Sequence, residues 1–258
     1  MRSARRMAAS GFTLIELLVV VVILIILAGL VLPKLDKIQL KANKGVAANN
    51  AAGTSRYIQT FRIMHNVYPD GWDSLLDPTH TTLSTKIDPQ LIGGGGGPTK
   101  LRISTSGEAL NGTDSTLRSL TRMGITKVYD EGAGSNGFPS DVFTSPARLL
   151  ADGDVYATIN EADGDGLALI QHLYPDTGTV TPGKQLIVLG FGVRNTTIGD
   201  VLQECPFYSN GNLEAYYGRF LAIFQMDTGG GRVELMGVVG ADADRIDEEI
   251  GDFYDPHN

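Results

Sequence analysis

The feature that most constrains this chain is an apolar run near its N-terminus, where every residue from Leu17 to Leu32 is apolar or glycine. With residues 12–16 it makes 21 residues. As an α-helix this stretch extends about 32 Å, close to the roughly 30 Å of a bilayer's hydrocarbon core. Arg2, Arg5 and Arg6 precede it, and basic residues stay on the cytoplasmic side of a membrane. The sequence therefore predicts a single-pass span with a cytoplasmic N-terminus and an exported remainder.

One acidic residue, Glu16, lies inside this apolar stretch. A carboxylate at the centre of a membrane helix costs about 2.5–3.5 kcal/mol on insertion scales, so it needs a function and a partner. Cleavage between Gly11 and Phe12 would create an α-amino group four residues from Glu16, at the same depth. The amine of a neighbouring subunit could then pair with this carboxylate and set the axial register of helices packed side by side.

The segment Gly11-Phe12-Thr13-Leu14-Ile15-Glu16, after a short basic leader and before a long apolar helix, resembles the class III signal of type IV pilins and type II secretion pseudopilins. The resemblance implies that an inner-membrane prepilin peptidase cuts after Gly11 and methylates Phe12. It also implies that Glu16 is the assembly glutamate. Pro33 stands where these proteins commonly carry a helix-weakening proline, so we expect a kink or a melted turn there.

Two other interpretations of the N-terminus remain open. A secretory signal peptide also begins with basic residues, but its apolar core usually has about 7–15 residues and cleavage follows that core. A plain membrane anchor with an incidental glutamate is the second alternative. Leu27-Ala28-Gly29 begins like a lipoprotein cleavage site, but Leu30 stands where the lipid-bearing cysteine is required, so lipidation is excluded.

The residues after Pro33 favour a continuing helix over 34–67, with a weak middle at Gly45, Asn49, Asn50 and Gly53. Small residues there allow close packing against a sheet. Larger residues recur every three or four positions and predict a buried stripe of Leu35, Ile38, Ala42, Val46, Tyr57, Phe61 and Met64.

Tyr68-Pro69-Asp70-Gly71 is a strong turn signal that should end this helix. Residues 72–76 then predict a short helical or packing segment. Tyr68, Pro69, Leu75 and Leu76 resemble the end of the long helix and the following leucine pair of major pseudopilins, a less specific likeness than that of the leader.

Beyond the helix the pattern changes to short strands. Gly93–Gly97 predicts a flexible joint. Runs rich in β-branched and aromatic residues predict strands at 126–129, 155–159, 167–174, 186–193, 220–226 and 233–239, the last two forming a hairpin. One long helix followed by strands predicts an α+β class, with the helix packed on an antiparallel sheet as in pilins. An inserted subdomain around residues 98–160 is an open alternative.

The predicted organisation along the chain has five parts. They are a leader at 1–11, a transmembrane and assembly helix at 12–33, an amphipathic helix and turn at 34–77, a glycine-rich joint at 78–100, and a β-rich periplasmic body at 101–258.

Charge and motifs exclude several classes of function. Removing residues 1–11, which hold three arginines and no acid, lowers the 21 Lys and Arg to 18 against 29 Asp and Glu, a net charge of −11. Such a body repels nucleic acid. The histidines are isolated in sequence, and the single cysteine, Cys205, has no catalytic signature around it and cannot form an intrachain disulfide. We therefore do not expect an enzyme.

Three acidic clusters offer oxygen ligands of the kind that calcium prefers, Asp152/Asp154, Asp163/Asp165 and the C-terminal one, and the C-terminal cluster is the strongest candidate for a metal site. Asp242, Asp244 and Asp247 place three carboxylates within six residues after a predicted strand, and calcium prefers such oxygen ligands. Gly240-Ala241-Asp242 resembles the start of the calcium loop of major pseudopilins, although Arg245 and the acidic residues after it depart from that loop. The alternative is a solvated acidic turn, and we predict no other cofactor.

These observations predict a structural subunit of a type II secretion pseudopilus or a type IV pilus-like filament. Its expected partners are the prepilin peptidase, an inner-membrane assembly platform and pilin-like subunits of the same or another kind. The alternative is a minor, tip-located pilin whose C-terminal body binds a surface or a secreted substrate.

Overall fold

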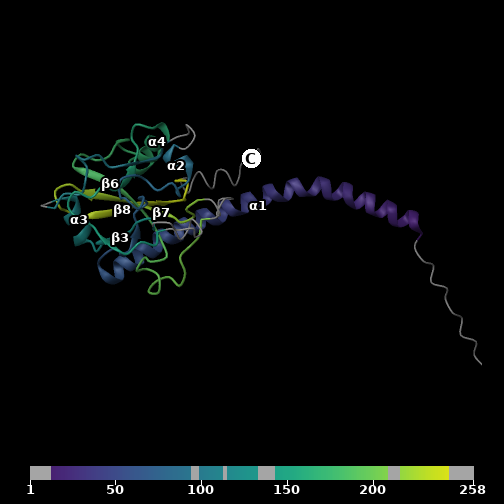
Figure 1. Cartoon of the computed structure of the whole chain (residues 1–258), viewed down its shortest axis with the longest axis horizontal. Helices are drawn as coiled ribbons and strands as arrows, with labels where there is room; N and C mark the ends of the chain where they lie inside the picture. The colour runs from purple at the N-terminus through teal and green to yellow at the C-terminus, as the bar shows by residue number, and fades with distance from the viewer. Residues whose placement is uncertain (1–12, 94–98, 113–114, 133–142, 209–215, 244–258) are drawn as a thin grey trace, which may run out of the picture.

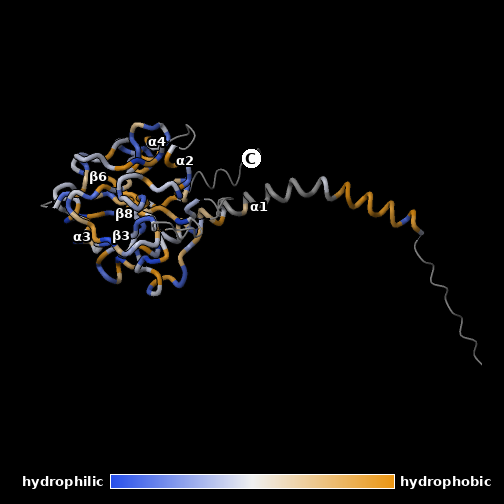
Figure 2. The backbone as a smooth tube through the Cα atoms, viewed as in Figure 1, coloured by the Kyte–Doolittle hydropathy of each residue, from blue (hydrophilic) through white to orange (hydrophobic). Residues whose placement is uncertain are grey.

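The computed structural model describes residues 13–93, 99–112, 115–132, 143–208 and 216–243, and for residues 28, 30–41, 43 and 44 the backbone alone. One helix, α1 (Leu14–His65), dominates its shape. Its C-terminal part lies on a folded body and its N-terminal part projects far beyond that body (Figure 1). Figure 2 shows that the far end of this projection is strongly hydrophobic. The helix ends at Asn66, which adopts a left-handed conformation with φ of 59°.

The helix is continuous through Pro33, so the melted turn expected there does not occur. Figure 1 shows a gradual curve along the projecting part. A proline removes one intrahelical hydrogen bond, and the bonds of the flanking turns hold the helix together around that gap.

The body is built on a mostly antiparallel six-stranded sheet with strand order β4-β3-β1-β6-β7-β8, which confirms the α+β class. Only β1 and β3 run parallel. Its strands are β1 (Trp72–Asp73), β3 (Lys127–Tyr129), β4 (Arg148–Leu149), β6 (Lys184–Gly190), β7 (Leu221–Asp227) and β8 (Val233–Val239). A separate pair is formed by β2 (Leu101–Ile103) and β5 (Ala157–Ile159), and three short helices complete the body: α2 (Pro89–Ile92), α3 (Thr116–Arg122) and α4 (Gly164–Leu173).

The central strands explain why this sequence forms the sheet. In β7 all residues from Leu221 to Met226 are buried, as expected for a strand covered on both faces. It pairs with β6 from Lys184 to Gly190 and with β8 through a turn at residues 228–232. The predicted hairpin of the last two strands is thereby confirmed.

The buried face of α1 differs from the predicted stripe. Small residues make the contact with the body, with Ala47, Ala51 and Thr54 almost fully buried, followed by Ile58 and Phe61. Of the predicted stripe, Val46 is 54% and Met64 61% exposed, so the prediction was wrong for these residues. The helix lies close to β8, and small side chains permit that approach, as expected from the small residues in the middle of the helix.

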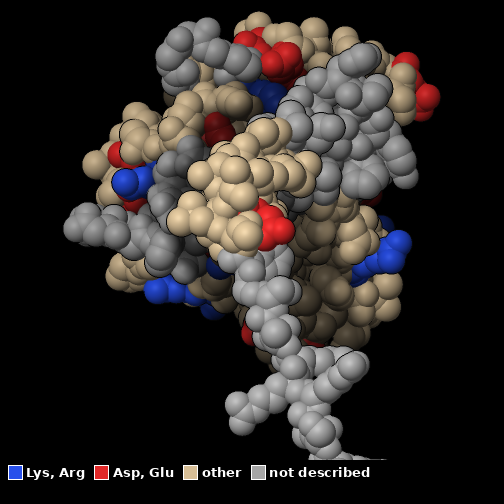
Figure 3. All heavy atoms as spheres, turned by 90° about the vertical axis from the view of Figure 1, so that its right-hand side faces the viewer, with Lys and Arg blue, Asp and Glu red and all other residues tan. Residues whose placement is uncertain are grey.

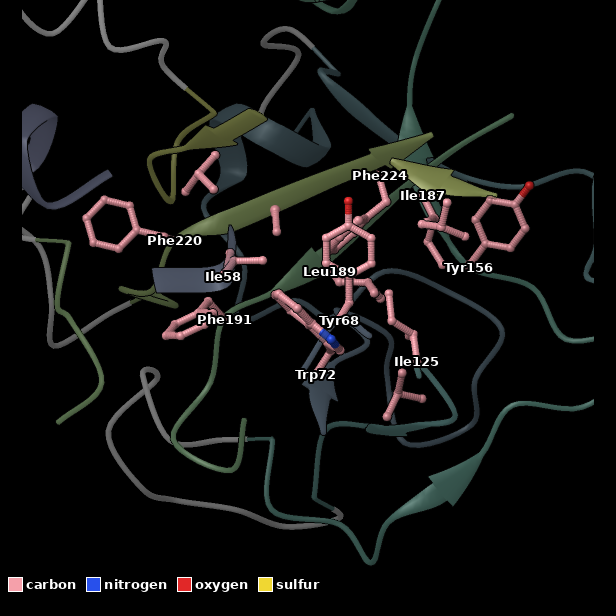
Figure 4. Packing of buried hydrophobic residues seen from close by; sticks show 14 of the residues in the cluster. Ile58, Tyr68, Trp72, Ile125, Tyr156, Ile187, Leu189, Phe191, Phe220 and Phe224 are labelled. Atoms are coloured by element: carbon pink, nitrogen blue, oxygen red, sulfur yellow. The ribbon is translucent and has the colours of Figure 1, made fainter. Parts of the chain in front are cut away.

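The hydrophobic core lies between α1 and the sheet, and Trp72 is at its centre (Figure 4). Its ring meets Phe224 and Phe191 edge to face, with ring centroids 5.2 and 5.7 Å apart. Tyr68, from the turn after α1, packs on Phe224 in the same way. The Tyr68 hydroxyl also accepts a hydrogen bond from Leu235 N in β8 at 2.9 Å, so this turn is fastened to the sheet.

Two segments have a different secondary structure from the one predicted. Residues 72–76, predicted as helical or packing, begin with strand β1, and Leu75 takes a left-handed φ of 66° that breaks any helix. Residues 167–174, predicted as a strand, belong to α4, which Asp163 caps by accepting a hydrogen bond from Asp165 N at 3.0 Å. The apolar run alone is compatible with a strand or a helix, and the cap at Asp163 favours the helix.

The middle of the chain is part of the same body. Strands β3 and β4 belong to the main sheet, and Leu101 of β2 is buried in one cluster with residues of β6 and β7. Within the predicted joint, Ile87 and Leu91 are fully buried in that cluster too. Residues 94–97 of the glycine run lie outside the described residues.

A half-buried ion pair makes the body sensitive to acid. Arg102 donates to both oxygens of Glu108 at 2.7 and 2.8 Å, and these hydrogen bonds lower the pKa of Glu108 to about 2. A carboxyl group whose pKa is lowered by folding stabilises the protein above its unfolded pKa and loses this contribution as the pH falls toward the folded value.

We therefore expect Glu108→Gln to flatten the loss of stability between about pH 4.5 and 2, by about 1–2 kcal/mol for this half-exposed group. Urea unfolding of wild type and variant across this pH range measures the difference. Parallel curves at all pH values would show that the pair does not carry this dependence.

Candidate functional site

The projecting end of α1 exposes a long apolar surface. From Leu14 to Leu27 every large apolar side chain is between 46% and 82% exposed. Figure 3 looks toward the body from the side to which this helix projects. Among helices formed by the described residues, none combines the length and the apolar character that a membrane crossing needs. A contiguous apolar surface of this extent marks a site of interaction with lipid or protein.

Glu16 lies in the first turn of this helix and forms a capping box with Thr13. Its Oε2 accepts hydrogen bonds from Thr13 N and Oγ1, both at 2.8 Å, and Glu16 N donates to Thr13 Oγ1 at 3.4 Å. Backbone N–H groups at a helix start have no partner within the helix, and this arrangement satisfies two of them.

The capping role of Glu16 was missed from the sequence, although the spacing Thr-x-x-Glu before an apolar run is its known signal. The box holds the Glu16 carboxylate against Thr13, at the N-terminal end of α1. The ion pair between Glu16 and the amine of a neighbouring subunit stays a prediction. Gly11 and Phe12, the predicted cleavage and methylation residues, lie outside the described residues, and of Pro33 only the backbone is described.

The predicted metal ligands are only partly described. Asp242 is 3% exposed, and the Tyr208 hydroxyl donates a hydrogen bond to its carboxylate. Lys100 Nζ donates to the Asp242 carbonyl oxygen at 3.1 Å. Asp244 and Asp247 lie outside the described residues, and within the described part no group of three or more His, Cys, Asp or Glu could hold a metal ion. Calcium binding by the C-terminal segment stays a prediction.

Tertiary structure gives partners to histidines that are isolated in sequence. His65 Nε2 lies 2.6 Å from Asp200 Oδ2, and both side chains are partly exposed. His80 Nδ1 lies 3.1 Å from Asp130, a buried carboxylate that also receives a hydrogen bond from Arg148 Nε at 2.7 Å. The first contact joins the end of α1 to a turn of the body, and the second joins two loops, which is a structural role.

Cys205 packs against the core as a half-buried thiol and donates to the Phe191 carbonyl oxygen at 3.1 Å.

The exposed apolar helix, the acid in its first turn and the folded body define a class of protein that anchors or assembles through its N-terminal helix. Residues 6–32 match the family described as the prokaryotic N-terminal methylation motif, the signature of prepilin-type signals in type IV pilins and pseudopilins. This match confirms the resemblance recognised in the leader. No curated protein and no solved structure gives a match.

The match covers the N-terminal segment alone, so it identifies the signal and carries no information about the fold of the body. The motif family consists of structural proteins that a prepilin peptidase processes and that assemble into pilin-like filaments.

Proposed function

We propose that this protein is a structural subunit of a type II secretion pseudopilus or a type IV pilus-like filament. In this proposal the prepilin peptidase cuts after Gly11 and methylates Phe12, and α1 anchors the subunit in the inner membrane with the body in the periplasm. The helix then packs with those of other subunits. The match of residues 6–32 to the methylation motif is the observation that carries the proposal.

The structure supports an assembly role through the burial and exposure of side chains along α1. Its C-terminal part is buried against β8, and its N-terminal part exposes only apolar side chains, Thr13 and Glu16 in the described region up to Leu27. In a membrane, such helices associate through van der Waals packing of their side chains, because the surrounding lipid is equally apolar.

Two finer assignments belong to the same proposal. The Tyr68-Pro69 turn favours type II secretion, and the single cysteine disfavours a pilin with a C-terminal disulfide. The second candidate function is a minor pilin at the filament tip that acts as a binding module. A polar cavity of about 470 Å³ beside the start of α3, at the end of the body remote from the projecting helix, favours that candidate.

The mature protein is expected to begin at Phe12, with its amine methylated. Only this cut provides a cation at the depth of Glu16, since an uncut chain would leave the carboxylate without one in the membrane. Mass spectrometry of the N-terminal peptide from membrane and filament fractions measures it. A peptide that begins at Leu30, or that still carries Arg2, would contradict the proposal.

A further inference from the structure

A groove of about 440 Å³ lies along α1, where the helix packs on the body. One side is formed by α1 between Asn49 and Tyr57, and the other by the loop at 198–207. Ala52 and Gly53 line the helix side, and because neither side chain extends beyond Cβ, another segment could approach the helix closely there. The groove is separate from residues 6–32, which carry the methylation motif.

Contacts at both ends of the loop hold it beside α1. His65 Nε2, at the end of the helix, lies 2.6 Å from Asp200 Oδ2. Near the other end of the loop, Asn50 Nδ2 donates to the Phe207 carbonyl oxygen at 3.5 Å. The two sides of the groove are therefore joined without any occupant, and a preformed groove lowers the ordering cost of a segment that enters it.

The described part of the chain ends close to this groove. Ala241 is buried in the same cluster as Ala47 of α1. Asp242 accepts a hydrogen bond from the hydroxyl of Tyr208, directly after the loop that forms one side of the groove. The 15 residues 244–258 follow and lie outside the described residues. They can reach the groove without a long linker, because they begin three residues after Ala241.

The sequence of this C-terminal segment predicts an amphipathic helix. Ile246, Ile250, Phe253 and Tyr254 follow the spacing i, i+4, i+7 and i+8, which places them on one face of a helix. Most acidic residues of the segment fall on the opposite face. The apolar positions extend over eight residue steps, about 12 Å in a helix. The α1 side of the groove has the same length, since it also extends over eight steps.

Size and charge agree with one face of such a helix as the occupant. A helix about 12 Å long and 10 Å across fills about 900 Å³, roughly twice the volume of the groove, so the side chains of one face can enter it. Among the described lining residues Arg56 is the one with a charge. Residues 34–57 contain five Lys or Arg and one Asp, whereas 244–258 contain six Asp or Glu and one Arg, a side-chain charge of −5. These opposite charges favour the approach of the segment to α1.

We propose that residues 246–254 dock in this groove as an amphipathic helix, with Ile246, Ile250 and Phe253 between α1 and the loop at 198–207. The occupant is the chain's own C-terminal segment. The inference goes beyond the filament role and does not depend on it. Docking would cover Tyr57, which is 36% exposed without the segment, and would close this side of α1 to other molecules.

Hydrogen exchange measured by mass spectrometry on the full-length protein in detergent tests the docking, with EGTA present to exclude calcium. We expect the backbone amides of residues 246–254 to exchange about tenfold or more slowly in the wild type than in Gly53→Leu, whose larger side chain fills the groove. Helix α1 accommodates this change, because a Cβ at position 53 would meet only Tyr57 Cε2, at 3.6 Å, and leucine favours a helix more than glycine does. The matched control is Gln59→Leu, at an exposed position of α1 outside the groove, which should keep the wild-type protection.

Crosslinking identifies the surface that the segment occupies. A photoreactive benzoylphenylalanine replaces Phe253, and trypsin then releases the C-terminal peptide 246–258 and the α1 peptides 45–56 and 57–62. We expect crosslinks between the C-terminal peptide and these α1 peptides of the same chain. Mixing isotope-labelled and unlabelled protein before irradiation distinguishes them from crosslinks between two chains.

Three results would overturn the proposal. They are rapid exchange of residues 246–254 in the wild type, equal protection in the wild type and in Gly53→Leu, or the absence of crosslinks to both α1 peptides. Crosslinks of mixed isotope composition would assign the groove to the C-terminal segment of a second copy and would equally refute docking within one chain.

Discussion

Replacing Glu16 by alanine is expected to leave cleavage after Gly11 intact and to lower incorporation into filaments by more than about tenfold. An amine buried between packed helices without its carboxylate partner costs about 3–5 kcal/mol. The substitution also makes the helix more apolar, so membrane insertion should not suffer. The measurement compares the amount of subunit in sheared filaments with the amount in the membrane, together with the mass of the N-terminal peptide.

The capping box provides a matched control for this experiment. Glu16→Gln removes the charge but keeps an oxygen that can accept from Thr13, since glutamine serves in capping boxes as glutamate does. If the ion pair sets the register, both variants fail to assemble. If Glu16→Gln assembles like the wild type and only Glu16→Ala fails, the cap is the essential function and the ion pair is refuted. A subunit that tolerates both changes belongs at the tip, where a neighbour is needed on one side only.

We expect the second large effect from Trp72→Ala, which should lower the free energy of unfolding by about 3–5 kcal/mol. Trp72 is fully buried, packs edge to face on Phe191 and Phe224, and donates from Nε1 to the Pro69 carbonyl oxygen at 2.6 Å. Its removal leaves a cavity between α1 and the sheet and an acceptor without its donor. For a body of this size we expect the melting temperature to fall by about 10 °C or more.

The measurement is thermal unfolding followed by circular dichroism, because Trp72 is the one tryptophan and its fluorescence is lost in the variant. Leu149→Ala is the control, since this side chain is 70% exposed and its truncation should change stability by less than about 0.5 kcal/mol. A small effect at Trp72, similar to that of Leu149, would mean that the centre of the core is placed wrongly.

Local patterns predicted those parts of the fold that local interactions decide. The end of α1 near Tyr68, strand β3 and the β7–β8 hairpin follow from turn residues and strand composition within a few positions. The α+β class followed from their order along the chain. Residues 167–174 show the limit of this reasoning, because a run of apolar residues fits either element and the cap at Asp163 decided for a helix.

Of the candidate site, the sequence predicted the methylation motif and the importance of Glu16. It also contained the spacing of the capping box, since Thr13 and Glu16 are three residues apart. The box was not predicted, because the partner expected for the Glu16 carboxylate lay in another subunit.

The sequence by itself determined the N-terminal signal, the apolar length of the assembly segment and its single acid, because these properties reside in consecutive residues and need no fold to be expressed. Only the tertiary structure decided which face of α1 is buried, since the close approach to β8 favours Ala47 and Ala51 over the larger Val46. It likewise decided which polar groups are left without partners, because burial and hydrogen bonding depend on segments that are distant along the chain and meet only in the folded body.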